Sequence, residues 1–236
     1  MLFALDIDRT IAIDQNAYAI FINTLLNLSI SQEVLMAVES YWAFCKLPEV
    51  EAYRFASPEN EERFQAAFMQ AKEALEVLAL LHPLPGAAAG VQTLMRYGKV
   101  AYYTSRGFEM QDTTRAWLAQ HDFPLGLEIV SCKNFYVKYM ASYSNTKATN
   151  EPVVLIDDNA SKLISAWPRA LEKWPVLDEY PSRLTLVAFG TPLDELSIHD
   201  VPFPVLGLPS WEPEHIQSLL DRVLLASHKE ESTHDH

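Results

Sequence analysis

The amino-acid sequence predicts an α/β fold, in which a parallel β-sheet is covered by helices on both faces and a separate helical module is inserted near the N-terminus. Two observations support this prediction. Five short apolar runs alternate with helical patterns along most of the chain, which is typical of a parallel sheet. Residues 14–83 break the alternation, because they contain helical patterns and no convincing strand.

The five apolar runs are expected to form the strands of the sheet. Most are rich in β-branched or aromatic residues and are bounded by turn or polar residues. They lie at residues 2–7, 100–103, 127–130, 153–156 and 184–189. Runs of this kind, which are mainly apolar rather than alternating, are typical of parallel strands with both faces buried.

Helical patterns separate these runs. Residues 87–97 follow Pro85 and Gly86 and end at Gly98, a suitable C-cap. Residues 111–120 form a second pattern, and residues 161–167 form a third that should stop at Pro168, because proline lacks the backbone donor. A last helix is expected at about residues 214–226, after a proline-rich stretch.

The inserted module is expected to hold three helices. They lie near residues 17–28, 33–47 and 64–81, and the last carries a sustained apolar stripe on one side. We therefore predict a core formed by residues 1–13 and 84–236 and a helical module formed by residues 14–83.

Composition limits the possible partners and location of the protein. The formal net charge of −13 disfavours nucleic acid, because an acidic surface repels a phosphate backbone. Two scattered cysteines, Cys45 and Cys132, suggest reduced thiols. The first residues do not read as a signal peptide, and no apolar stretch is long enough to span a membrane. We expect a cytoplasmic protein without a membrane partner, and its oligomeric state stays open.

Carboxylates follow two of the predicted strands. Asp6 and Asp8 end the first strand, and Asp157 and Asp158 follow the fourth. The carboxyl ends of parallel strands meet at one edge of a sheet, where such folds bind ligands. Like charges gathered there need a compensating cation, and carboxylate oxygens suit Mg²⁺. Taken singly, the first pair could be a turn and the second an N-cap.

The second predicted strand ends in hydroxyl residues. Thr104 and Ser105 follow it, and hydroxyls with free backbone N–H groups can hold a phosphate oxygen. Arg106 comes next, and it could contact a substrate or pair with a surface acid.

Together these residues resemble the motifs of the haloacid dehalogenase-like (HAD) superfamily. The first motif, Asp-x-Asp-x-Thr/Val, is matched by Asp6, Asp8 and Thr10. The second, a Ser/Thr after a strand, is matched by Thr104, and the fourth, an acidic pair, by Asp157 and Asp158. The resemblance implies a Rossmann-like core, and it implies that the helical module is a type 1 cap.

The third motif of this superfamily is a lysine, for which the sequence offers alternatives. Lys133 is favoured because it lies nearest a strand end and leaves room for a full helix, and Lys138 is the alternative. Lys147 lies too close to the fourth strand.

The resemblance implies a Mg²⁺-dependent phosphatase that acts on a small phosphorylated metabolite. Asp6 would be the nucleophile and form an aspartyl-phosphate, and Asp8 would be the general acid and base. Asp6, Asp8, Asp157 and Asp158 would hold Mg²⁺, while Thr104, Ser105 and the lysine would hold the phosphate. Two other hypotheses are a catalytically silent binding protein with the same Mg²⁺ pocket and a phospho-acceptor receiver domain, whose motif order differs.

Overall fold

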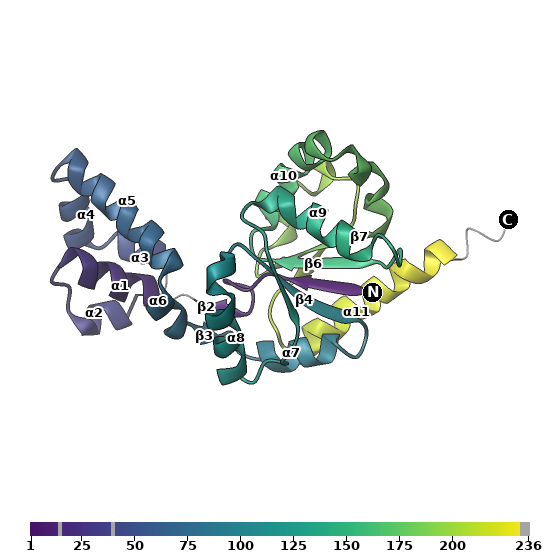
Figure 1. Ribbon diagram of the computed structural model, residues 1–236, viewed down its shortest axis with the longest axis horizontal. Helices are drawn as coiled ribbons and strands as arrows, with labels where there is room; N and C mark the ends of the chain where they lie inside the picture. Colours follow the sequence, from purple (N-terminus) through teal and green to yellow (C-terminus); the bar gives the residue numbers. More distant parts are fainter. Residues whose placement is uncertain (14–15, 39–40, 232–236) are drawn as a thin grey trace. The chain divides into compact units, whose positions relative to one another are not determined.

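The computed structural model describes residues 1–13, 16–38 and 41–231, and the chain in it divides into two compact units (Figure 1). The core unit comprises Met1–Ile11, Pro83–Ser105 and the chain from Leu118 onward. The helical unit comprises Ala12–His82 and Arg106–Trp117. The segment Arg106–Trp117, which the sequence placed in the core, therefore groups with the helical unit.

The core unit contains a six-stranded, fully parallel sheet. Its strands are β1 (Leu2–Leu5), β4 (Lys99–Thr104), β5 (Glu128–Ser131), β6 (Val153–Asp157), β7 (Leu184–Phe189) and β8 (Val205–Leu208). Their order across the sheet is β5-β4-β1-β6-β7-β8. Leu2 is in register with Lys99 on one side and Val153 on the other. The predicted α/β fold is thus confirmed, and β1 lies in the interior of the sheet.

Helices cover both faces of this sheet. Figure 1 shows α9 (Phe135–Thr146) and α10 (Ala160–Lys173) on one face, and α7 (Ala87–Leu94) and α11 (Pro213–Glu231) on the other. Beneath α9 and α10, Tyr139, Trp167 and Phe203 pack edge-on or tilted, with ring centroids 5.1–5.9 Å apart. These large buried rings fix the two helices against the strands.

Helix α10 does not end at Pro168 as predicted. It continues to Lys173, because Trp167 and Ala170 are both buried and hold the helix on the sheet on either side of the proline. Pro168 itself lies on the exposed face of the helix.

Strand β8 was not predicted. It follows Pro202 and Pro204, whose presence suggested a loop. Proline is tolerated just before a strand at the edge of a sheet, and β8 is such a strand. Five short 3₁₀ helices join the remaining elements: η1 (Phe108–Met110), η2 (Pro175–Glu179), η3 (Pro181–Arg183), η4 (Leu193–Glu195) and η5 (Ile198–Asp200).

The helical unit contains more and shorter helices than predicted. They are α1 (Ala17–Leu26), α2 (Gln32–Met36), α3 (Tyr41–Cys45), α4 (Pro48–Arg54), α5 (Pro58–Glu73) and α6 (Leu75–Ala79). The expected helix at 33–47 is α2 and α3, and the one at 64–81 is divided where Ala74 takes an extended conformation. Helix α8 (Gln111–Gln120) begins in this unit, and the indole of Trp117 donates to the carbonyl of Leu81 at 2.9 Å.

Two further strands are short. β2 (Ala12–Ile13) and β3 (His82–Pro83) pair with each other near the ends of the predicted insertion. Within the described residues, no helix is both long enough and apolar enough to cross a membrane. Both cysteines are buried and free.

Candidate active site

The order of the strands creates a binding position at the carboxyl end of β1. β4, the next strand of the sheet after β1 along the chain, lies on one side of β1, and β6 lies on the other side. From β6 the chain continues to β7, which lies farther from β1. The two connections diverge between β1 and β6, and parallel sheets bind ligands at such a point. Asp6 and Asp157 lie at the ends of these two strands.

Asp6 is held rigidly by the sheet. Its backbone N–H donates to the carbonyl of Ile156 at 2.9 Å, which continues the pairing of β1 with β6 by one residue. Only 6% of the residue is exposed. Its carboxylate therefore has a fixed position and little contact with water, two features that suit a nucleophile.

The acidic pair lies where β6 passes into α10. Asp157 is fully buried, and its carboxylate accepts from the backbone N–H of Asn159 at 2.8 Å. The side chain of Asn159 donates to the carboxylate of Asp158 at 2.7 Å. The pair thus takes part in the N-terminal turn of the helix, as an N-cap would, and still presents oxygen atoms to the site.

Three carboxylates converge at this point. Oxygen atoms of Asp6, Asp157 and Asp158 all lie within 4.8 Å of one another. The carboxylate of Asp8, which the sequence placed among the metal ligands, is not in this cluster, and Asp8 is partly exposed. We refer to Asp6, Asp157 and Asp158 as the acidic cluster.

Lys138 lies against the acidic cluster, and this corrects the preference for Lys133. The ammonium of Lys138 donates to Asp6 at 2.7 Å and to Asp157 at 2.6 Å, and the residue is buried. Lys133 is exposed.

Strand order explains the correction. β5 lies two strands away from β1, roughly 10 Å at the usual strand spacing, so a lysine at its end is remote from Asp6. Helix α9 connects β5 to β6 and must pass over β4 and β1. Lys138, in the first turns of α9, is therefore carried above the carboxylates.

Burial and the neighbouring charges shift the pKa values of the ionisable groups in this site. Burial raises the pKa of Asp6 well above its usual range, with Lys138 opposing this and Asp157 and Asp8 adding to it. Burial, together with the charge of Asp157, raises the pKa of Asp158 to about 6. Burial disfavours the charged form of Lys138, but Asp6 and Asp157 outweigh it and raise its pKa. Burial is thus the main cause of the raised pKa values of Asp6 and Asp158, and the charge of Asp157 adds to it in both cases.

The turn after β1 is braced from two sides. Thr10 accepts through its hydroxyl from the backbone N–H of Asp158 at 3.1 Å, and its carbonyl accepts from the indole of Trp211 at 2.6 Å. Arg9, between Asp8 and Thr10, has a left-handed φ of 64°. Sequence reasoning missed Trp211, because no local pattern signals a residue that reaches the site from 201 positions away.

The two hydroxyl residues at the end of β4, Thr104 and Ser105, differ in their exposure to solvent. Thr104 is buried at the end of β4, next to β1, and its carbonyl accepts from the backbone N–H of Cys132 at 2.7 Å. Ser105 is exposed. Arg106 belongs to the helical unit, where it is buried and donates to Thr114 at 3.2 Å. Thr104 is thus fixed at the same edge of the sheet as Asp6.

Comparison with solved structures identifies this architecture. A putative HAD-hydrolase YfnB from Bacillus subtilis, bound to magnesium, matches with a TM-score of 0.56 and 11% identity over 93% of this chain and 98% of that one. A HAD family hydrolase from Deinococcus radiodurans with bound phosphate and sodium matches with a TM-score of 0.53 and 14% identity, over 96% of this chain and 95% of that one. A predicted phosphatase from Clostridium acetobutylicum matches with a TM-score of 0.52 and 14% identity, over 93% of this chain and 98% of that one.

The chain has the haloacid dehalogenase-like fold. The expected resemblance is thus confirmed at the level of the fold, although no family model matches the sequence and no curated protein matches it. The helical insertion after β1 is consistent with a cap on this haloacid dehalogenase-like core.

The donor set of the haloacid dehalogenase-like core fits a divalent cation. Its three carboxylates offer hard oxygen ligands at close range, as Mg²⁺ requires. Three carboxylates and one ammonium leave two negative charges, which one divalent ion would balance.

Proposed function

We propose that this protein is a Mg²⁺-dependent phosphatase that hydrolyses a small phosphomonoester through an aspartyl-phosphate on Asp6. The observation that carries the proposal is the convergence of Asp6, Asp157 and Asp158 around the buried Lys138. A phosphate dianion would be repelled by these carboxylates alone, so the site needs both the lysine and a cation. A dehalogenase, which handles no phosphate dianion, would need no such set of charges.

In the first step, a carboxylate oxygen of Asp6 attacks phosphorus and the bond from phosphorus to the leaving oxygen breaks. Asp8, two residues along the chain and partly exposed, gives its proton to the leaving alkoxide. The second step reverses these roles: Asp8 takes a proton from water, the water oxygen attacks phosphorus, and the bond to Asp6 breaks. Inorganic phosphate leaves, and both carboxylates return to their starting states.

Lys138 and Thr104 would hold the phosphoryl group during both steps. Lys138 carries a fixed positive charge next to Asp6, and it would favour the charge that develops on the phosphoryl oxygens. Thr104 lies at the end of the neighbouring strand β4 and offers a hydroxyl there. Ser105, exposed beside it, offers a second one.

Asp6, Asp157 and Asp158 would hold Mg²⁺, with Asp8 able to contribute through its backbone carbonyl. When bound, the ion supplies charge neutralisation between an anionic nucleophile and an anionic substrate.

Hydrolysis of p-nitrophenyl phosphate and a panel of small phosphomonoesters tests the proposal. Wild-type protein should turn over at least one of them with Mg²⁺ and none with EDTA, and Asp6→Asn should be inactive in both. In Asp8→Asn, an aryl phosphate can still leave unaided, so the phosphorylated Asp6 should accumulate and appear by mass spectrometry on the peptide that contains it. If wild type and Asp6→Asn are equally inert across the panel, the protein is a silent binding protein with this fold.

A further inference from the structure

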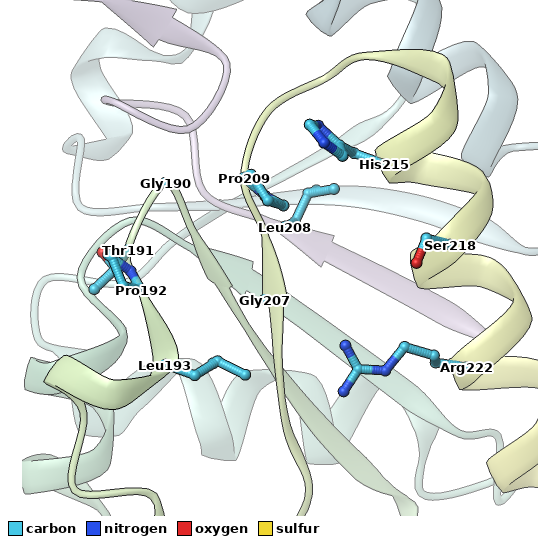
Figure 2. A pocket seen from close by; sticks show the side chains of 10 residues that line it. All are labelled: Gly190, Thr191, Pro192, Leu193, Gly207, Leu208, Pro209, His215, Ser218 and Arg222. Carbon is cyan, nitrogen blue, oxygen red and sulfur yellow. The ribbon is translucent and has the colours of Figure 1, made fainter.

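A cavity lies beside the carboxyl ends of β7 and β8, and its walls differ chemically. It has a volume of about 500 Å³, within the range of small-molecule sites. Gly190 and Thr191 follow β7, Gly207 and Leu208 belong to β8, and α11 forms the opposite wall (Figure 2). None of these residues belongs to the acidic cluster.

One wall presents polar side chains from a single helix face, and one of them, His215, bonds through Nδ1 to the hydroxyl of Ser210 at 2.8 Å. His215, Ser218 and Arg222 are spaced three and four residues apart on α11, so they align along one side of it. The residues between them that point to the sheet are apolar and buried: Ile216, Leu219 and Leu220. Figure 2 shows the guanidinium of Arg222 extending from α11 toward Gly207.

The other walls are apolar. Pro192, Leu193, Leu208 and Pro209 line them, and in Figure 2 the side chain of Leu193 extends toward Gly207 from the side opposite Arg222. Thr191 also lines the cavity, but its hydroxyl donates to backbone carbonyls, including that of Asp158 at 3.4 Å. The cavity therefore combines an apolar side with a polar side.

The floor at Gly207 adds a backbone donor. Leu186 donates to the carbonyl of Pro204, and Gly190 donates to that of Leu208, so the even-numbered residues of β8 bond to β7. Alternate peptide groups in a strand point to opposite edges, so the N–H and C=O of Gly207 point away from β7. β8 is the edge strand, and this side of Gly207 carries no neighbouring strand.

The charge of the cavity is opposite to that of the protein. The chain has 31 acidic and 18 basic residues, yet none of the described residues that line the cavity is acidic. The nearest ion pair is that of His215 with Glu212, at 3.9 Å. Within the described residues, Arg222 forms no ion pair. One permanent cation, facing an apolar wall and no acid, matches a ligand with one negative charge and an apolar body.

We propose that this cavity binds a small monocarboxylate with an apolar body, at a site separate from the acidic cluster. The carboxylate pairs with Arg222 and accepts from Ser218, and the apolar body lies against Leu193 and Leu208. A planar guanidinium fork matches a carboxylate in two parallel hydrogen bonds. Arg222 is the one permanent cation among the described lining residues, so it balances the single charge of a monocarboxylate but not the charge of a dianion.

Hexanoate is a suitable probe, with hexanol and inorganic phosphate as its matched controls. Titration of ¹⁵N-labelled protein with hexanoate should give saturable shifts at the amides of Gly207, His215 and Ser218, and hexanol should bind at least about tenfold more weakly because it cannot pair with Arg222. Arg222→Gln should weaken hexanoate by about tenfold or more. Arg96→Gln, which removes an exposed cation elsewhere in the core unit, should leave binding unchanged.

Gly207→Ala tests the cavity without removing a charge. A Cβ at this position meets Leu193 at 3.6 Å, an ordinary contact, so the fold is expected to tolerate the methyl group while the cavity loses volume. Hexanoate binding should weaken in this variant as well. The proposal is overturned if hexanoate shows no saturable shifts at these amides, if both variants bind it like wild type, or if inorganic phosphate displaces it and binds more tightly.

Discussion

Lys138 partly neutralises two buried carboxylates, and its removal is therefore predicted to be costly. Lys138→Met leaves Asp6 and Asp157 buried without their common partner, which should lower the free energy of unfolding by about 3–5 kcal/mol. The proposed turnover should be lost as well. Urea unfolding and phosphatase assays measure the two effects.

Lys133 provides the matched control, because it is five positions earlier and exposed. Lys133→Met should change stability by less than about 0.5 kcal/mol and leave turnover intact. Equal effects of the two substitutions would mean that the contacts of Lys138 contribute nothing specific.

Asp158 gives the metal-free protein an unusual dependence on pH. Its pKa of about 6 in the folded protein exceeds the ordinary value of 3.8, so the folded state binds this proton more tightly than the unfolded state. The contribution of Asp158 to stability is thus fully present below about pH 4 and is lost as the pH rises through 6. In EDTA, the stability of wild type relative to Asp158→Asn should fall between these pH values. A rise over the same interval would contradict the assignment.

Helix α10 shows how tertiary packing can override a local signal. Pro168 lies inside the helix on its exposed face, and the helix continues because Trp167 and Ala170 are buried against the sheet. Pro168→Ala restores a backbone donor at this exposed position. It should raise the free energy of unfolding by about 1–3 kcal/mol, since proline is about 3 kcal/mol less favourable than alanine in a helix interior.

The neighbouring substitution Ser165→Ala is a control for this measurement. Ser165 is exposed on the same helix and donates only to the carbonyl of Ser161 among its described contacts. The Ser165→Ala substitution should change the denaturation midpoint only slightly. A Pro168→Ala protein no more stable than this control would show that the proline is accommodated without cost.

For the whole molecule, binding of a divalent cation should be coupled to folding. A cation that binds only the folded acidic cluster stabilises the protein by mass action. At about ten times the dissociation constant, the gain is about 1.4 kcal/mol, or roughly 3–6 °C in melting temperature for a chain of this size. Differential scanning fluorimetry with MgCl₂ measures it.

NaCl at matched ionic strength controls for general screening, which matters in a chain of net charge −13. Asp157→Asn should abolish the extra shift with Mg²⁺. A shift that persists in this variant would place the bound cation elsewhere on the acidic surface.

Local sequence patterns were enough to predict the layers of the core, because parallel strands covered on both faces are mainly apolar and the helices that cover them carry a one-sided apolar stripe. It also located Asp6, Asp157 and Asp158, since polar residues directly after such strands fall at one edge of the sheet.

Local patterns could not show which lysine reaches these carboxylates, because this depends on the order of the strands in the folded chain and on the path of α9 across them. For the same reason Trp211, strand β8 and the cavity beside Arg222 were not foreseen. They join parts of the chain that are far apart in sequence, and local patterns carry no information on which distant segments become neighbours.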